Sequence, residues 1–313
     1  MTLKKPLFWD YKKPNFLSNL LLPFTIPILI NNKINNKSKF KNKKIKTICV
    51  GNIYLGGTGK TPTTVVLNDL LKKMSKNVSI GKKYYSEHKD EHMLLQNRTD
   101  LILGLTRKDI INKAIKRRKE ILIFDDGLQD KEIDYDLKFV CFSSKEWIGN
   151  GRLIPSGPLR EQLNSLTKYD AVFIKNNSKN FKNINQTIKD INPKIKVFNT
   201  EYVISYKKKI NKKSNYLIFS GIGSPHDFKE ILIKNKIKIV DEIIFPDHFE
   251  YKLEDIIKIK KRAKKLNAKI ITTEKDFMKV KKFDKKNIDY LPVSLKIQNK
   301  DKLLNFIKLK LYE

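Results

Sequence analysis

The chain has 313 residues, of which 40% are hydrophobic, and its formal net charge is +33. Such a length predicts two domains or one large one, and the apolar content is sufficient for a buried core. Only two cysteines occur, Cys49 and Cys141, both within apolar runs. They exclude a framework of disulfides and indicate a reduced, cytoplasmic protein.

The net charge could indicate a nucleic-acid-binding protein, and this alternative has to be weighed. The excess is almost all lysine, mixed with asparagine and isoleucine along the whole chain. Recognition of nucleic acid usually concentrates arginine and aromatic residues on one element, and no helix-turn-helix, RRM-like or zinc-finger pattern occurs. We therefore expect no specific nucleic acid as partner, whereas the charge favours anionic partners such as an acidic membrane surface.

The most apolar stretch runs from Phe16 to Ile30. It is too short for a transmembrane helix, Pro23 and Pro27 interrupt it, and the residues after it offer no cleavage site of a signal peptide. A lysine-rich segment, residues 33–46, follows. An apolar segment beside a cationic one suits peripheral docking on an anionic leaflet, and the alternative is a core helix followed by a solvated loop.

The next feature is a glycine-rich turn. Ile45 to Val50 predicts a strand, and a helix is expected from about Thr61. Between them, backbone N–H groups and the helix N-terminus would bind phosphate, Lys60 would reach the β- and γ-phosphates, and the Thr61 hydroxyl would bind Mg²⁺. The turn therefore predicts ATP or GTP binding by Tyr54, Leu55, Gly56, Gly57, Thr58, Gly59, Lys60 and Thr61.

One position departs from the usual phosphate-loop motif. The motif has a glycine six positions before its lysine, where this chain has Tyr54. An ordinary tight turn is the alternative interpretation. The order of strand, glycines, Lys-Thr and helix favours the phosphate loop.

Further apolar segments alternate with polar stretches of helix length, which predicts an α/β fold with a mainly parallel sheet. The strand at residues 121–124 ends in Asp125, Asp126 and Gly127. Downstream of a phosphate loop, a carboxylate at the carboxyl end of a strand would position Mg²⁺, although Asp-Asp-Gly alone is a common turn. Other strands are expected at residues 77–81, 101–105, 139–142 and 171–174, and helices at 61–74 and 108–119.

A loop rich in glycine and proline, residues 149–161, contains Arg152 and Arg160. Arginine binds phosphate in a bidentate manner, so in a chain so rich in lysine these two residues are candidate phosphate ligands. The alternative is a structural loop.

Residues 207–214 are very polar, and we expect a domain boundary there. Residues 1–206 would form a phosphate-loop domain with the apolar start, and residues 207–313 a smaller α/β domain. In the second domain, strands are expected at 216–219, 238–245 and 269–273, and helices from about 227 and at 253–266.

The chain has four histidines. His88 and His92 are four residues apart, but the acid that should directly follow the first histidine of a zinc motif is missing, so we expect no transition-metal site. A carboxylate near them would serve better as the base for an attacking hydroxyl. His248, beside Asp247, is a second acid–base candidate, with a helix-capping or buried structural role as the alternative.

Taken together, the motifs resemble those of one family. The chain resembles tetraacyldisaccharide 4'-kinase, the lipid A 4'-kinase of Gram-negative bacteria, from about residue 45 to 280, and the apolar start agrees with this. The motifs occur in family order: Gly51 to Pro62, Asp125 to Gln129, Gly149 to Arg152, Gly157 to Glu161, Ser220 to Pro225, Phe245 to His248 and Thr272 to Asp276.

The resemblance implies transfer of the ATP γ-phosphate to the 4'-hydroxyl of tetraacyldisaccharide 1-phosphate, which gives lipid IVA. It implies Mg²⁺, work at the cytoplasmic face of the inner membrane, and two α/β/α domains that are joined by a β-stranded linker and enclose the active site. Lys60 and Thr61 match the ATP loop, and Asp125 and Asp126 the metal position. Asp90 aligns with the base and His248 with the histidine that assists it, while Gln129 and Glu161 match positions near the nucleotide and the metal.

One region departs from the family. Gly81-Lys82-Lys83-Tyr84 replaces the usual Ser-Arg-Gly-Tyr, and Lys89-Asp90-Glu91-His92 replaces Gly-Asp-Glu-Pro after a shortened connection. Either the base lies in this altered loop, or its role has moved to His248. Outside the family, the competing interpretation is a P-loop ATPase or GTPase switch of the partitioning or maturation-factor type, for which the chain shows no convincing signature lysine or base-specificity motif.

Overall fold

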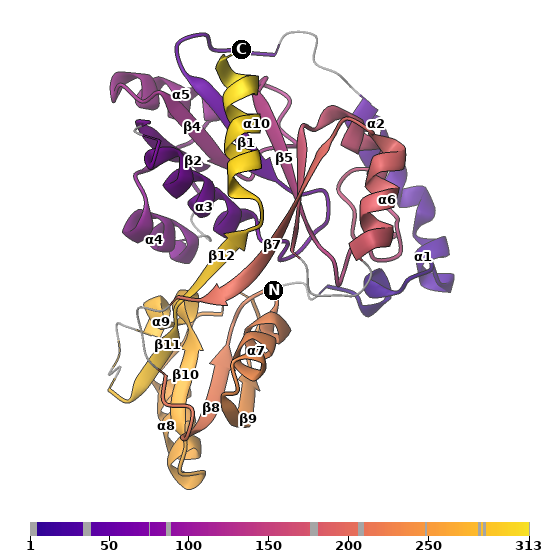
Figure 1. Ribbon diagram of the computed structural model, residues 1–313. Helices are drawn as coiled ribbons and strands as arrows, with labels where there is room; N and C mark the ends of the chain where they lie inside the picture. The colour runs from indigo at the N-terminus through magenta and orange to yellow at the C-terminus, as the bar shows by residue number, and fades with distance from the viewer. Residues whose placement is uncertain are drawn as a thin grey trace. The chain divides into compact units, whose positions relative to one another are not determined.

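A computed structural model describes residues 5–33, 39–74, 76–85, 89–175, 181–205, 210–247, 249–280, 283 and 286–312. The chain forms two compact units (Figure 1). The larger unit contains the described residues of Leu3–Tyr84, Thr99–Glu201 and Leu295–Glu313. The smaller unit contains those of Tyr85–Arg98 and Tyr202–Ser294.

The larger unit is built on an eight-stranded sheet with the order β12-β7-β6-β5-β1-β4-β2-β3. All neighbouring pairs from β7 to β3 are parallel. Hydrogen bonds from Ser205 N to Pro292 O and from Gln298 N to Asn199 O show that β12 runs antiparallel to β7. The strands are β1 (Lys46–Gly51), β2 (Val78–Lys83), β3 (Leu101–Gly104), β4 (Ile121–Asp125), β5 (Leu137–Ser143), β6 (Ala171–Lys175), β7 (Lys196–Ile204) and β12 (Val293–Ile297).

Helices cover both faces of this sheet, because its central strands carry apolar side chains on both faces. All residues of β1 and β5 except Lys46 and Lys138 are buried, and successive side chains enter opposite faces. Ile48 and Val50 pack with α3 (Lys60–Lys72) and α10 (Lys300–Tyr312), which cross in front of the sheet in Figure 1. The other face packs against α5 (Arg107–Lys116), α6 (Phe181–Ile191) and the 3-10 helix η4 (Leu163–Lys168).

The smaller unit has a four-stranded parallel sheet with the order β11-β10-β8-β9. One face packs against α8 (Leu253–Lys265) and the other against α7 (Pro225–Lys234). The helix α4 (Lys89–Arg98) packs against α9 (Glu274–Val280), where the Arg98 Nε donates to Glu274 Oε1 at 3.1 Å. The strands are β8 (Asn215–Ser220), β9 (Lys238–Ile244), β10 (Lys269–Thr273) and β11 (Ile288–Leu291). Two mainly parallel sheets of unequal size, each covered by helices, agree with the predicted fold class.

The sequence predicted a single domain boundary after residue 206, and the observed units divide the chain at several places instead. The chain passes from the larger to the smaller unit at residue 201 within β7, close to the predicted place, but it returns at residue 295 within β12. Helix α10 therefore packs on the larger sheet, while α4 belongs to the smaller unit. Helices α10 and α4 both pack against elements that are distant in sequence. The pattern of residues within each helix could not show these contacts.

The N-terminal apolar stretch forms several short helices instead of one long helix. These are η1 (Leu7–Asp10), α1 (Phe16–Leu20), η2 (Leu22–Thr25) and α2 (Ile26–Lys33), and α2 has no buried residue. We name residues 5–33 the N-terminal segment. Its large side chains that are exposed are Leu7, Tyr11, Phe16, Leu17, Leu20, Leu22, Phe24, Ile26 and Ile30. In the part of the chain that the structure describes, no helix has the length and apolarity that a membrane crossing requires.

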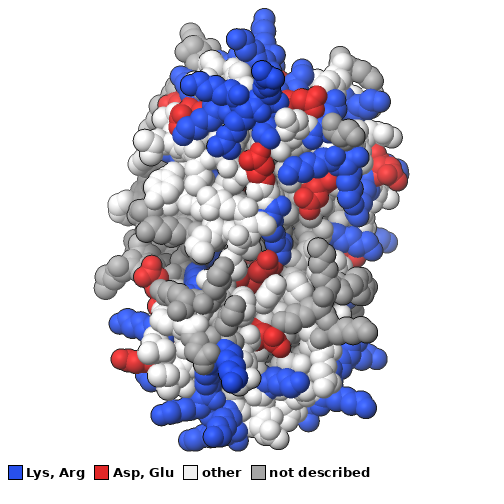
Figure 2. Space-filling view, turned by 90° about the vertical axis from the view of Figure 1, so that its left-hand side faces the viewer, with Lys and Arg blue, Asp and Glu red and all other residues white. Residues whose placement is uncertain are grey.

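Basic side chains are spread over the face that Figure 2 shows, with acidic ones among them. Many of the cations in the described residues are paired, as in Lys119 with Asp100 at 2.6 Å and Lys138 with Asp134 at 2.9 Å.

Candidate active site

The candidate site lies at the carboxyl end of β1, where the glycine-rich loop leads into α3. Gly59, the residue before α3, has φ 87°, which a side chain would disfavour. Asn52 is buried, and its Nδ2 donates to the carbonyl oxygens of Tyr54 at 2.5 Å and Gly56 at 3.3 Å. The loop is therefore shaped from within by one amide side chain. Its form confirms the predicted strand–loop–helix context.

The Lys60 ammonium lies between two side chains. Its Nζ is 3.0 Å from Asp126 Oδ2 and donates to Asn52 Oδ1 at 3.2 Å. Burial raises the pKa of the Asp126 carboxyl, but Lys60 and Arg160 outweigh this effect and lower the pKa to about 2. Asp126 is therefore a stable counter-ion that holds the lysine at the loop when no phosphate is bound.

Asp125, at the end of β4, accepts hydrogen bonds from three side chains. The Thr61 hydroxyl donates to Oδ2 at 3.0 Å, and the Thr64 hydroxyl donates to Oδ1 at 3.3 Å. The third donor is Lys82 at the end of β2, whose Nζ is 2.5 Å from Oδ2. Asp125 is 2% exposed and Lys82 is 7% exposed. This is a buried ion pair directly beside the hydroxyl of the phosphate loop.

Arg160 joins the second aspartate to Gln129. Its Nη1 lies 3.4 Å and 3.5 Å from the two carboxylate oxygens of Asp126, and 3.3 Å from Gln129 Oε1. The backbone of Asp126 has φ 64°, and its carbonyl accepts from Arg107 Nη2 at 2.7 Å. The two arginines thus fix a strained turn that follows β4. Of the two arginines predicted as phosphate ligands, Arg160 lies at the site.

Glu161, predicted as a metal ligand, makes hydrogen bonds within a buried network. Its Oε1 accepts from Tyr169 Oη at 2.8 Å and from Gln129 Nε2 at 2.8 Å, and Gln129 Nε2 also donates to Asn52 O at 2.9 Å. Burial and the Glu161 carboxylate raise the pKa of Tyr169, so the phenol remains a donor. Glu161 therefore supports Gln129 and the loop.

The remaining loop residues have different neighbours. The Leu55 N–H donates to Pro158 O at 2.8 Å, and the Thr58 N–H donates to Gly56 O at 3.0 Å. The buried Thr58 hydroxyl has no partner within the described residues. The Gly57 carbonyl lies 3.4 Å from Nζ of the fully buried Lys175 at the end of β6. Tyr54 directs its hydroxyl to Asp10 Oδ1 at 2.8 Å, towards the N-terminal segment.

Two predicted catalytic residues lie outside the described residues. These are His248 and the side chain of Asp90, whose backbone belongs to α4. Among the side chains that are described, no group of three or more His, Cys, Asp and Glu residues could hold a metal ion.

Sequence reasoning did not find the roles of Lys82, Lys175 and Tyr169. Lys82 is the penultimate residue of β2 and Lys175 the last residue of β6, and the carboxyl ends of these strands meet at the same edge as those of β1 and β4. The sequence did contain a signal for the two lysines, because each lies at the carboxyl end of an apolar strand. Parallel sheets bind their ligands at the edge formed by these carboxyl ends.

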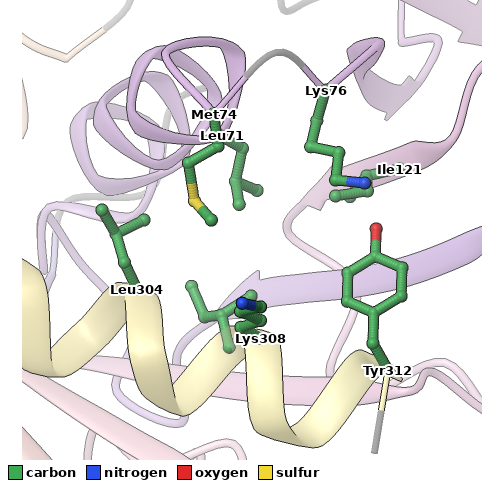
Figure 3. A pocket seen from close by; sticks show the side chains of 8 residues that line it. Leu71, Met74, Lys76, Ile121, Leu304, Lys308 and Tyr312 are labelled. Atoms are coloured by element: carbon green, nitrogen blue, oxygen red, sulfur yellow. The ribbon is translucent and has the colours of Figure 1, made fainter.

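Two small pockets lie in the larger unit. The more apolar one, about 140 Å³, opens between α10 and the C-terminal end of α3, where Leu304 and Tyr312 face Leu71 and Met74 (Figure 3). Ile121, the first residue of β4, also lines it, so this pocket lies at the edge of the sheet opposite the phosphate loop. The second, about 100 Å³, borders Gln129 and Glu161 and belongs to the site just described.

A parallel sheet with a phosphate loop after its central strand, and carboxylates after the adjacent one, defines a P-loop NTPase-like α/β protein. Residues 17–312 match the protein family LpxK, described as tetraacyldisaccharide-1-P 4'-kinase. The chain belongs to this family and is a kinase.

Two relatives illustrate the match. A protein of Pelagibacter ubique (strain HTCC1062) named tetraacyldisaccharide 4'-kinase is 47% identical over 305 residues, which cover 97% of each chain. A protein of the same name from Rickettsia akari (strain Hartford) is 34% identical over 96% of this chain and 95% of its own. These identities favour the kinase over the switch ATPase or GTPase.

A solved structure supports the fold. LpxK from Aquifex aeolicus, crystallised in complex with ATP, superposes with a TM-score of 0.70 and 22% sequence identity, covering 95% of this chain and 100% of that one. This likeness confirms the predicted fold class.

Proposed function

We propose that this kinase transfers the γ-phosphate of ATP to the 4'-hydroxyl of tetraacyldisaccharide 1-phosphate, which gives lipid IVA. The proposal is supported by the family and, within the structure, by one observation above all. Lys60, Thr61 and Asp125 come together where β1 and β4 end, with a glycine-rich loop between them. Phosphoryl transfer requires positioning and charge neutralisation of this kind more than covalent chemistry.

In this proposal the loop binds the triphosphate. The N–H groups of residues 54–61 other than those of Leu55 and Thr58, together with the N-terminus of α3, favour the phosphate oxygens. Lys60 leaves Asp126 for the β- and γ-phosphates, and Arg160 then remains to balance Asp126. Gln129, held by Glu161 and Asn52, fixes the side of the loop.

The residues present also fit Mg²⁺, which prefers oxygen ligands and accompanies the phosphates of ATP. The Thr61 hydroxyl and the Asp125 carboxylate are 3.0 Å apart and are the oxygens that we assign to it. When bound, Mg²⁺ would neutralise charge on the β- and γ-phosphates. Asp126 and Glu161 stay predicted as further ligands; in the described residues Asp126 pairs with Lys60 and Glu161 accepts from Tyr169.

The base that accepts the proton of the 4'-hydroxyl is assigned from the family resemblance. Asp90 is our first candidate and His248 the second. Comparison of Asp90→Asn with His248→Ala tests the assignment. If Asp90 is the base, its variant should lower kcat by about 10²–10⁴-fold with little change in ATP affinity. If kcat survives in Asp90→Asn and falls in His248→Ala, the base is His248.

The N-terminal segment is our candidate for docking on the cytoplasmic face of the inner membrane. It presents Leu7 at 80% exposure, Phe16 at 78% and Phe24 at 66%. An acceptor with four acyl chains stays partly in a bilayer, so an enzyme that acts on it benefits from an apolar surface flanked by lysines.

The activity is tested by transfer of labelled γ-phosphate from ATP to tetraacyldisaccharide 1-phosphate in detergent micelles. We expect a labelled bis-phosphorylated lipid with the wild-type chain and none with Lys60→Ala. ATP hydrolysis that does not respond to the lipid, with no labelled lipid, would contradict the proposed acceptor.

A further inference from the structure

Tyr54 occupies a position at which most phosphate loops have glycine, and its side chain leaves the loop. The side chain is 2% exposed, and the hydroxyl donates to Asp10 Oδ1 at 2.8 Å. The ring packs in a small apolar cluster with Leu153 and Leu159, which also includes Ile28 and Leu29 of α2. One residue of the phosphate loop thus hydrogen-bonds to Asp10 of the N-terminal segment and belongs to the cluster against which α2 packs.

On its other side, Tyr54 is part of the loop that would bind ATP. Its carbonyl accepts from Asn52, the residue that also accepts from Lys60. A Cβ atom added at Gly56 would lie 3.1 Å from Tyr54 Cε1, so the ring lies directly against the loop. A shift of the ring would therefore change the glycine backbone, because little free space separates them.

The N-terminal segment has an inward and an outward side. Inward, Trp9 Nε1 donates to Pro155 O at 2.9 Å, and Ser18 Oγ donates to Ser156 O at 2.6 Å. Outward, the same short helices expose the apolar side chains of Leu7, Phe16 and Phe24. Whatever binds the outward side therefore acts on a segment that contacts the phosphate loop.

We propose that Tyr54 is a positioning residue that couples docking of the N-terminal segment on an anionic lipid bilayer to ATP binding at the phosphate loop. The inference rests on the proposed membrane-docking surface. A docked segment holds Asp10 and α2 in place, so that Tyr54 is fixed and the loop loses less freedom when the nucleotide binds. Such coupling is reciprocal: the factor by which bilayers tighten ATP binding equals the factor by which ATP tightens bilayer binding.

The experiment uses the full chain, a non-hydrolysable ATP analogue with Mg²⁺, and vesicles of phosphatidylethanolamine and phosphatidylglycerol. Nucleotide affinity is measured with and without vesicles, and sedimentation with vesicles is measured with and without nucleotide. For the wild-type chain we expect both affinities to rise by one common factor, about 5–20-fold.

Two single variants make the test specific. Tyr54→Phe keeps the ring in its cluster but removes the hydroxyl that donates to Asp10, so the common factor should fall to about 2-fold or less. Tyr11→Phe is the matched control, because Tyr11 lies in the same segment and is 49% exposed. It should retain the wild-type factor.

The outcomes separate the inference from the proposed surface. A wild-type chain that sediments with vesicles but shows unchanged nucleotide affinity would overturn the coupling alone. A chain that does not sediment would overturn the surface and the coupling together. An equal loss of the factor in both variants would also overturn the role of Tyr54, because it would reflect a general disturbance of the segment.

Discussion

Both sheets have a buried aspartate at or just beyond the carboxyl end of a central strand, and the two residues have different surroundings. Asp125, which ends β4 of the larger sheet, accepts from the side chains of Thr61, Thr64 and Lys82. Asp276, three residues after β10 of the smaller sheet, is fully buried. It accepts from the Gly221 N–H at 3.0 Å, Tyr251 Oη at 3.0 Å and Thr273 Oγ1 at 2.6 Å.

The difference lies in the donors. At Asp125 one donor is a cation and another is the hydroxyl that would bind Mg²⁺, so a ligand can replace them. At Asp276 the donors are a backbone amide, a phenol and a hydroxyl, and they hold the turn after β8 to the start of α9. In the proposed function, the carboxylate of Asp125 is therefore available for chemistry, whereas the contacts of Asp276 maintain the fold of its unit.

The largest expected effect concerns the cation of the phosphate loop. Lys60→Ala should lower the rate of phosphate transfer by at least about 10³-fold, because the γ-phosphate loses its cationic partner. The rate is measured with labelled ATP and acylated acceptor. Lys229→Ala is the matched control at the smaller sheet, where Lys229 pairs with Glu242. Near-normal transfer by Lys60→Ala would contradict the assignment of the site.

Asp125→Asn should lower kcat by about 10²-fold and also lower the melting temperature, because it removes the carboxylate charge that pairs with the buried Lys82 ammonium. The double variant Asp125→Asn with Lys82→Met separates the two effects. It should regain much of the lost melting temperature and remain inactive. If the double variant regains activity, Asp125 has no direct part in transfer and only balances Lys82.

Asp276→Asn should act on stability alone. The amide leaves its buried donors poorly matched, which costs the smaller unit about 3 kcal/mol, whereas nucleotide affinity of the larger unit stays within about 2-fold of wild type. Thermal unfolding and ATP-analogue binding measure the two quantities. Tyr251→Phe, which removes one donor, should cost only about 1 kcal/mol. A loss of ATP affinity equal to that of Asp125→Asn would show that the two aspartates share one role.

How much of the fold and the candidate site could be predicted depends on how far apart in sequence the contacting residues lie. The phosphate loop and Asp125 were predictable, since each is a contiguous pattern of strand and turn. The contact of Asp125 with Lys82 was not, because it requires β2 to pair with β4, where Gly81 lies opposite Phe124. The role of Asp276 was likewise hidden, although the family motif that contains it was recognised.

The same principle explains why the division into compact units differs from a single boundary in the sequence. Val293–Ile297 is a short strand that could join either sheet, and only its hydrogen bonds to β7 place it in the larger one. Helix α4 has a weak apolar pattern, and it joins the smaller unit through contacts with α9 such as Arg98 with Glu274. The unit to which β12 or α4 belongs depends on contacts with residues that are distant in sequence. The residue types within the strand or the helix do not determine it.

The smallest effect concerns Asp126, the neighbour of Asp125, which has cationic partners but is about one-third exposed. Its folded pKa of about 2 is below the usual value of about 3.9 for an unfolded chain. The ionised form therefore stabilises the folded chain above about pH 4, and this contribution is lost as the pH falls from about 4 towards 2.

We expect the difference in unfolding free energy between wild type and Asp126→Asn to shrink by about 1 kcal/mol between pH 5 and about pH 2, a value reduced for solvent screening. Urea denaturation of both proteins across this range measures it, and the other carboxyls cancel in the difference. A difference that does not vary with pH would mean that Lys60 and Arg160 give no net stabilisation to the charged carboxylate. In that case Lys60 would be free of Asp126 before the nucleotide arrives, and the exchange of partners proposed for phosphate binding would not be needed.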